Sequence, residues 1–228
     1  DPVVSATPEN HEANGIWHAV ITIDGPAASG KSTVARMVAS RLAVPFVSSG
    51  LLYRAATRVA LSGGVDLEDP RALLGELHRF DVRLEPGLDG NTIVVGGEDI
   101  TGRLQTDEVD AAVSAVAKHP EVRTWVNDRL QEIQPPFVVE GRDMGTAVFP
   151  NARYKFYLTA PAEVRARRRL GERRNDLQSV AALLRRRDEL DARQLQPADD
   201  AERIDTGSRT LEDVVNLVVE RVTRAGKQ

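Results

Sequence analysis

The sequence predicts an α/β fold, with a parallel five-stranded sheet flanked by helices, a small inserted antiparallel β subdomain and a short helical lid. Short β-branched segments alternate with amphipathic stretches in both halves of the chain, which is typical of proteins built from β-α-β units. In the middle this alternation gives way to two strand patterns around a tight-turn signal. An arginine-rich helical stretch further on accounts for the lid.

The chain opens with a β-α-β pattern. Residues 19–24 form a β-branched run suited to a buried parallel strand, and a glycine-rich turn follows it. Residues 31–42 repeat apolar positions on one face of a helix. A second strand is expected at residues 45–48 and a second helix at 51–61.

The middle of the chain has antiparallel character. Residues 81–85 and 92–95 flank Asp89-Gly90, a dipeptide typical of β-hairpin turns, and a further short segment follows at 98–101. The later elements are helices at residues 107–118 and 120–133, strands at 137–140, 154–158 and 203–206, and a closing helix from residue 211.

These patterns divide the chain into parts. We expect residues 1–16 to be a flexible N-terminal tail, because this stretch is polar and contains prolines. Residues 17–72 and 104–228 would form the core, with the lid at about 161–180. Residues 73–103 would form the inserted, monophosphate-binding subdomain, supported by the following helices to about residue 133.

Composition excludes several classes of protein. The chain has no cysteine, so disulfides, zinc-thiolate sites and thiol nucleophiles are ruled out. No apolar run is long enough to span a membrane. The net charge of −4 argues against a protein that coats nucleic acid. We expect a cytoplasmic protein without nucleic-acid or membrane partners and, although the sequence does not settle the oligomeric state, a monomer.

Positive charge is concentrated in one segment. Residues 165–193 contain ten arginines against five acids, a local +5 that leaves −9 for the rest of the chain. A basic segment in an acidic protein indicates one localised anionic ligand, although a solvated helix face gives the same pattern.

An eight-residue segment after the first strand matches G-x-x-x-x-G-K-[ST] at every fixed position. Its glycines let backbone N–H groups point inward, and the helix that follows directs its positive dipole end to the same place. The pattern predicts a phosphate-binding loop (P-loop) for ATP, with Mg²⁺ as cofactor. The expected ATP-binding residues are Gly25, Pro26, Ala27, Ala28, Ser29, Gly30, Lys31, Ser32 and Thr33, with Ser32 as metal ligand and Lys31 as a catalytic residue.

Three longer stretches, residues 21–32, 48–54 and 140–150, are similar to those of the bacterial cytidylate kinases, P-loop nucleoside monophosphate kinases that phosphorylate CMP and dCMP. The Gly-Arg-Asp-Met-Gly-Thr segment that begins at Gly141 is far more distinctive than a P-loop alone. The similarity extends from about residue 19 to the C-terminus. The β insert falls where this family has its enlarged monophosphate-binding domain.

The resemblance implies a reaction and an acceptor site. The γ-phosphate of ATP would pass to CMP or dCMP, giving ADP and CDP or dCDP, while a lid closes on the transferring phosphate. Arg54 and the catalytic Arg142 would bind the acceptor phosphate, a task that suits a guanidinium fork. Ser114, Arg123 and Asp143 would bind cytosine, whose exocyclic amine can donate to a carboxylate.

The resemblance also implies roles for residues around these. Ser49 and Tyr53 would line the acceptor pocket, Gly141 would adjoin it, Arg187 and Asp191 would hold the ribose, and Arg193 would match a third phosphate-binding arginine. The lid would contribute the catalytic residues Arg165, Arg168 and Arg169. The lid and residues 191–197 are shorter here than in the family.

Some of these residues also have a purely structural interpretation. Tyr53 fits a core position, and Ser114 lies in a helix of small residues. Asp143 beside Arg142 can form a surface ion pair.

Other functions stay open on the sequence alone. A kinase for UMP, shikimate or another nucleoside monophosphate would share the P-loop, and a non-catalytic nucleotide sensor would use it as a switch. A GTP-binding protein would need Asn-Lys-x-Asp, which the sequence lacks. A metal hydrolase is disfavoured because the four histidines are scattered. The expected partners are ATP and CMP or dCMP.

Overall fold

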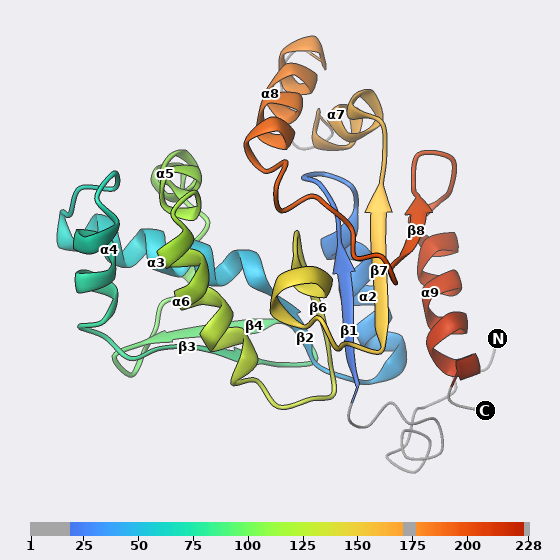
Figure 1. The fold of residues 1–228 in the computed structure, drawn as a ribbon, viewed down its shortest axis with the longest axis horizontal. Coiled ribbons are helices and arrows are strands. Elements are labelled where there is room, and N and C mark those ends of the chain that lie inside the picture. Colours follow the sequence, from blue (N-terminus) through green and yellow to red (C-terminus); the bar gives the residue numbers. More distant parts are fainter. Residues whose placement is uncertain (1–18, 171–176, 226–228) are drawn as a thin grey trace. The chain divides into compact units, whose positions relative to one another are not determined.

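The computed structural model describes residues 19–170 and 177–225. The expected tail, residues 1–16, and residues 171–176 of the expected lid lie outside the described residues. The chain divides into two compact units (Figure 1). The first is made of Asp1–Phe46 and Pro135–Gln228, and the second of Val47–Gln134.

A five-stranded parallel sheet with the order β2-β6-β1-β7-β8 lies in the first unit, apart from Val47 and Ser48 of β2. Its strands are β1 (Val20–Asp24), β2 (Phe46–Ser48), β6 (Phe137–Gly141), β7 (Tyr154–Thr159) and β8 (Glu202–Asp205). The central strand β1 pairs in parallel with β6 and with β7. The inner strands are buried almost throughout, which explains their continuous apolar, β-branched sequences. The predicted α/β fold is confirmed.

Two helices of the first unit pack together against the sheet. These are α2 (Lys31–Leu42) and α9 (Leu211–Ala225). Their apolar faces complete one core with the strands, in which each fully buried aliphatic side chain contributes about 1.5–3 kcal/mol. The core includes Ile21, Val34, Val38, Leu158, Val215 and Val218.

The carboxyl edge of the sheet carries the remaining elements of this unit. The π-helical turn η2 (Met144–Val148) follows β6, and α7 (Ala162–Leu170) follows β7. The helix α8 (Leu177–Leu190) packs against α7, and Figure 1 shows both helices beyond the carboxyl end of β7. Because ligands of open α/β sheets bind at this edge, these elements are placed to form a site.

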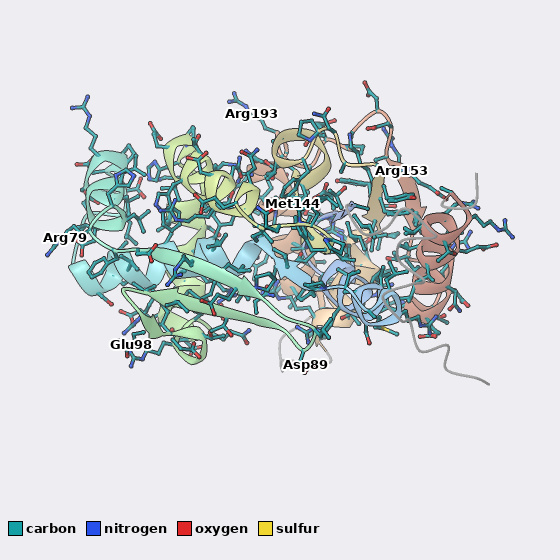
Figure 2. The ribbon with its side chains drawn as sticks, turned by 90° about the horizontal axis from the view of Figure 1, so that it is seen from below. Arg79, Asp89, Glu98, Met144, Arg153 and Arg193 are labelled. Carbon is teal, nitrogen blue, oxygen red and sulfur yellow. The ribbon has the colours of Figure 1, made fainter. Side chains whose placement is uncertain are left out.

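The second unit contains the predicted hairpin. Strands β3 (Val82–Pro86) and β4 (Asn91–Val95) pair antiparallel, and β5 (Glu98–Asp99) completes a three-stranded sheet. Figure 2 labels Asp89 in the turn between β3 and β4. The helical elements are α3 (Ser49–Gly63), α4 (Pro70–Leu77), η1 (Thr101–Arg103), α5 (Asp107–Ala117) and α6 (Pro120–Gln131).

The helix α4 was not expected from the sequence, although the residues at its start form a typical helix N-terminus. The side chain of Asp69 accepts hydrogen bonds from the N–H groups of Arg71 and Ala72, and Pro70 occupies the first helical position. Its Leu73 is fully buried. The helix is short, so its apolar periodicity is weak in the sequence.

The second unit extends beyond the 73–103 subdomain expected from the sequence, because helices on both sides of the hairpin belong to it. Its role in binding a monophosphate stays a prediction. Within the described parts of the chain, no helix combines the length and the apolar character that crossing a membrane requires.

Candidate active site

The P-loop connects β1 to α2 at the carboxyl edge of the sheet. A β-carbon on Gly25 would lie 2.4 Å from the carbonyl oxygen of Leu158 in β7. Gly30 has a φ of +89°, and a β-carbon there would lie 2.7 Å from Cδ2 of Leu211. The two glycines therefore serve different needs, a close approach of the loop to β7 and a left-handed turn into α2.

The N-terminus of α2 suits an anion. Among the described residues no side chain caps it, and its first turn contains no acidic residue. The N–H groups of the first turn lack helical partners and, with the helix dipole, attract negative charge. Ser32 and Thr33 are exposed there. Lys31 is only 8% exposed, and its Nζ donates to the carbonyl oxygen of Pro26 at 3.2 Å, so the cation lies back across the loop.

The charge of Lys31 depends on its surroundings. Burial lowers its pKa to about 8; Glu140 and Asp24 act to raise it, whereas Arg142 and Arg187 lower it further. At neutral pH the ammonium is still mostly protonated. A polyphosphate beside it would raise the pKa again, because an opposite charge favours the charged form.

Asp24 connects the last residue of β1 to the turn after β6. Its carboxylate accepts hydrogen bonds from the N–H groups of Met144 at 2.9 Å and Gly145 at 2.8 Å. Burial raises the pKa of Asp24 to about 7, despite these two bonds, and Asp143 and Glu140 raise it as well. The contact fixes the backbone directly after Arg142 and Asp143.

Three of the predicted acceptor residues meet in the first unit. Arg142 donates from Nε to Oδ2 of Asp191 at 2.5 Å, and Nε of Arg187 lies 3.8 Å from the same oxygen. Asp143 is buried next to Arg142, so it is not an exposed surface carboxylate. Arg193 instead is exposed, and Figure 2 shows its side chain extending outward.

Two of the predicted lid arginines contact the P-loop itself. Nη1 of Arg165 lies 3.2 Å from the carbonyl oxygen of Ala27, and Nη1 of Arg168 lies 3.1 Å from that of Ser29. Arg169 is partly exposed on the same helix.

Gly141 ends β6 in the first unit, and the other predicted acceptor residues lie in the second unit. Arg54 on α3 donates to the carbonyl oxygen of Leu104 at 3.0 Å, and its Nη2 lies 2.6 Å from Oδ1 of Asp110 on α5. The guanidinium of Arg123 lies over the ring of Tyr53, 5.5 Å from its centroid. The two predicted cations of this unit therefore lie on α3 and α6.

Two further predicted residues of this unit occupy different environments. Ser49 is buried at the start of α3, whereas Ser114 is exposed on α5. The exposure of Ser114 leaves its hydroxyl accessible to a ligand.

Comparison with known proteins identifies the family. The family model described as cytidylate kinase matches residues 21–224. The chain belongs to the cytidylate kinase family. A protein named cytidylate kinase from Thermus thermophilus is 56% identical over 205 residues, which cover 90% of this chain and 99% of that protein. One of the same name from Deinococcus radiodurans is 52% identical over 200 residues, covering 88% and 97%.

A solved structure shares the fold. An uncharacterized protein from Eubacterium ventriosum superposes with a TM-score of 0.50 at 11% identity, covering 90% of this chain and 98% of that one. At this identity the likeness concerns the architecture alone. The membership of the cytidylate kinase family rests on the sequence matches.

Four residues lie beside predicted site residues in this member of the cytidylate kinase family but were not predicted from the sequence. They are Asp24, Asp110, Asp188 and Thr206. The sequence could have predicted Asp24 as a site residue, since it ends a buried strand directly before the P-loop. It could not have predicted Asp110, because its partner Arg54 is distant along the chain and only the packing of α3 on α5 brings them together.

The site fits a Mg²⁺ ion that arrives with the nucleotide. Within residues 19–170 and 177–225 no group of three or more His, Asp or Glu side chains could hold a metal ion. Mg²⁺ keeps several waters and binds through substrate phosphates with one or two protein oxygens, so it needs no such group. The exposed hydroxyl of Ser32 at the N-terminus of α2 offers one such oxygen.

Proposed function

We propose that the chain transfers the γ-phosphate of ATP to CMP or dCMP, giving ADP and CDP or dCDP. The observation that carries the proposal is a buried lysine lying across a P-loop in a chain whose similarity to proteins named cytidylate kinase spans about nine-tenths of its length. An oxygen of the acceptor phosphate attacks the γ-phosphorus, and the bond from that phosphorus to the bridging oxygen of ADP breaks. The acceptor phosphate is already an anion, so no general base is needed.

The P-loop residues would bind the donor. Their backbone N–H groups and the start of α2 would hold the phosphates of ATP, and Lys31 would compensate charge that develops toward the leaving ADP. Mg²⁺, if bound, would be held by the hydroxyl of Ser32 and would supply Lewis-acid stabilisation of the phosphate charge. The contribution of the chain is positioning and charge compensation, which together lower the barrier without covalent chemistry.

Two arginines would bind the phosphate of the acceptor. We propose that Arg54 and Arg142 bind its phosphate and that Asp143 accepts from the exocyclic amine of cytosine. The contact of Arg142 with Asp191 uses Nε, which leaves donors on its two terminal nitrogens for a phosphate. The proposed site further includes Ser49, Tyr53, Ser114, Arg123, Gly141, Arg187, Asp191 and Arg193.

One assay separates this proposal from its rivals. ADP formation is measured with CMP, dCMP, UMP and AMP as acceptors under the same conditions. We expect turnover with CMP or dCMP that exceeds turnover with UMP and AMP. Faster turnover with UMP would contradict the base assignment, and calorimetry that finds tight ATP binding with no ADP formation would indicate a nucleotide sensor. The cytoplasmic location and the monomeric state stay predictions.

A further inference from the structure

Arg165 holds one carbonyl of the P-loop from outside. It is 4% exposed, and Nε donates to the carbonyl oxygen of Ala160 at 3.0 Å. Nη1 donates to the carbonyl oxygen of Ala27 at 3.2 Å and to Oδ1 of Asp188 at 3.1 Å, and Nη2 contacts the other oxygen of Asp188. All three guanidinium nitrogens are therefore engaged by the segment before α7, by α8 and by the loop, which is unlike a side chain reserved for substrate.

Arg168 and Thr206 hold a second carbonyl. Nη1 of Arg168 lies 3.1 Å from the carbonyl oxygen of Ser29 and 2.9 Å from Oγ1 of Thr206, and its Nη2 donates to the carbonyl oxygen of Thr206 at 2.6 Å. Oγ1 of the fully buried Thr206 lies 3.1 Å from the carbonyl oxygens of Ser29 and Thr159. Because this hydroxyl accepts from Arg168, its own hydrogen is available to one of these carbonyls.

These contacts determine the direction of N–H groups in the P-loop. In a planar trans peptide the carbonyl and the following N–H point in opposite directions. The carbonyl of Ala27 belongs to the same peptide as the N–H of Ala28, and that of Ser29 to the same peptide as the N–H of Gly30. Donors outside the loop therefore direct these two N–H groups away from the arginines and polarise them. Ala28 has a φ of +59°, unfavourable for a non-glycine residue, so this conformation needs such support.

We infer that Arg165, Arg168, Asp188 and Thr206 form a clamp on the carbonyl side of the P-loop and set its affinity for polyphosphate as positioning residues. The inference rests on the proposed nucleotide site but not on the identity of the acceptor. It gives Asp188 and Thr206, which have no assigned role in the proposed reaction, a function that they exert through the peptide groups of the loop.

The chain offers a matched control for Asp188. Glu163 and Arg185 form a second ion pair between α7 and α8, with side chains 54% and 55% exposed. Asp188→Asn weakens the clamp, whereas Glu163→Gln removes charge from the same helix pair at the surface. If a substitution acted only by loosening the packing of α7 on α8, it would affect the binding of polyphosphate and the binding of CMP alike.

The first experiment is titration calorimetry of the full chain with ATP, inorganic tripolyphosphate and CMP, at a temperature where each variant is folded. Asp188→Asn is expected to weaken ATP and tripolyphosphate alike by about tenfold, the effect of losing about one charged hydrogen bond. Binding of CMP, and all binding by Glu163→Gln, should stay within about twofold of the unmodified chain. A lower melting temperature with unchanged dissociation constants, or a loss for ATP but not for tripolyphosphate, would overturn the clamp.

A second pair of variants tests the clamp with a smaller change. Thr206→Val replaces the hydroxyl by a methyl group of similar size and is expected to weaken tripolyphosphate about fivefold, whereas Thr206→Ser retains the hydroxyl and should restore affinity to within about twofold. Equal affinities for the two variants would overturn the inference. Failure of the proposed function looks different, since the unmodified chain would then bind ATP without forming ADP in the presence of CMP, while the clamp variants would still weaken tripolyphosphate binding.

Discussion

Two proposed anion sites use different binding groups. One is the P-loop in the first unit, and the other is the Arg54 cluster in the second unit, which consists of Arg54, Asp110 and the carbonyl of Leu104. In the P-loop the binding groups are backbone N–H groups from consecutive residues, next to a lysine that bonds to the same loop. In the cluster the proposed binding group is the side chain of Arg54, held by partners about fifty residues away. Local sequence can specify the first arrangement, whereas the second requires packed helices.

The comparison also concerns burial. Lys31 is 8% exposed, whereas the side chain of Arg54 is 28% exposed and that of Asp110 31% exposed. Burial strengthens the field of a charge, because water screens it less, and it makes the pKa of that charge sensitive to its neighbours. We therefore expect larger effects from changes at the P-loop than from changes at the Arg54 cluster.

The largest expected effect is that of Lys31→Met, which removes the buried cation but keeps a chain of similar length. Turnover should fall by about 10²–10³-fold or more, as for loss of a preorganised donor to developing charge. ADP formation with ATP and CMP measures it. As a control, Lys155→Met removes another buried ammonium, which donates to the carbonyl oxygen of Pro150 and to Asp200. The control should lower the melting temperature and change turnover far less; equal losses would contradict the role of Lys31.

Asp24→Asn tests the burial of charge beside the P-loop. A carboxyl whose pKa rises from 3.8 to about 7 on folding contributes stability below pH 4 that is lost as the pH rises through 7. The loss from this group amounts to at most about 4 kcal/mol. The free-energy difference between the unmodified chain and the variant should therefore favour the unmodified chain more at pH 4 than at pH 8.

Denaturant unfolding of both proteins at several pH values measures this difference. Subtracting the two pH profiles cancels groups that titrate alike in both. Lys31 and Tyr157 interact electrostatically with Asp24 and have shifted pKa values of their own, so their titration sets how completely the profiles cancel. A difference that is independent of pH would show that folding does not raise the pKa of Asp24.

Arg54→Met tests the proposed anion site of the second unit by removing its cation. The KM for CMP should rise about 10- to 100-fold while the KM for ATP is unchanged, because a charged hydrogen-bond donor to phosphate is lost. Arg58→Met is the matched control, since Arg58 lies one turn further along α3 and pairs with Glu108 of α5 at 3.3 Å. If both variants raise the KM for CMP equally, the α3–α5 packing rather than the Arg54 cation is responsible.

The smallest of these effects is expected for Asp143→Ala. Loss of one base-recognising carboxylate should weaken CMP binding about tenfold and leave ATP binding within about twofold. Calorimetry with each nucleotide separates the two. An equal loss for ATP and CMP would indicate that Asp143 only supports the turn after β6.

Much of the fold could be read from the sequence because its signals are local. The β-branched runs of β1 and β6 predict buried parallel strands, and Asp89-Gly90 predicts the hairpin of β3 and β4. The helix α4 was missed because a short helix has few apolar repeats, although Asp69 and Pro70 mark its start. The helix α3 lies in the second unit although it precedes the expected 73–103 subdomain, because its place depends on tertiary packing rather than on local sequence.

The sequence by itself determined the P-loop and the family, because glycine at positions 25 and 30 and lysine at 31 are required by backbone conformation and charge at fixed spacing. Only the tertiary structure decided what holds these groups in place. Arg165 reaches Asp188 across 23 positions, and Arg168 reaches Thr206 across 38. Such contacts form when helices and strands pack, and no local pattern records which distant carbonyl or carboxylate an arginine will meet.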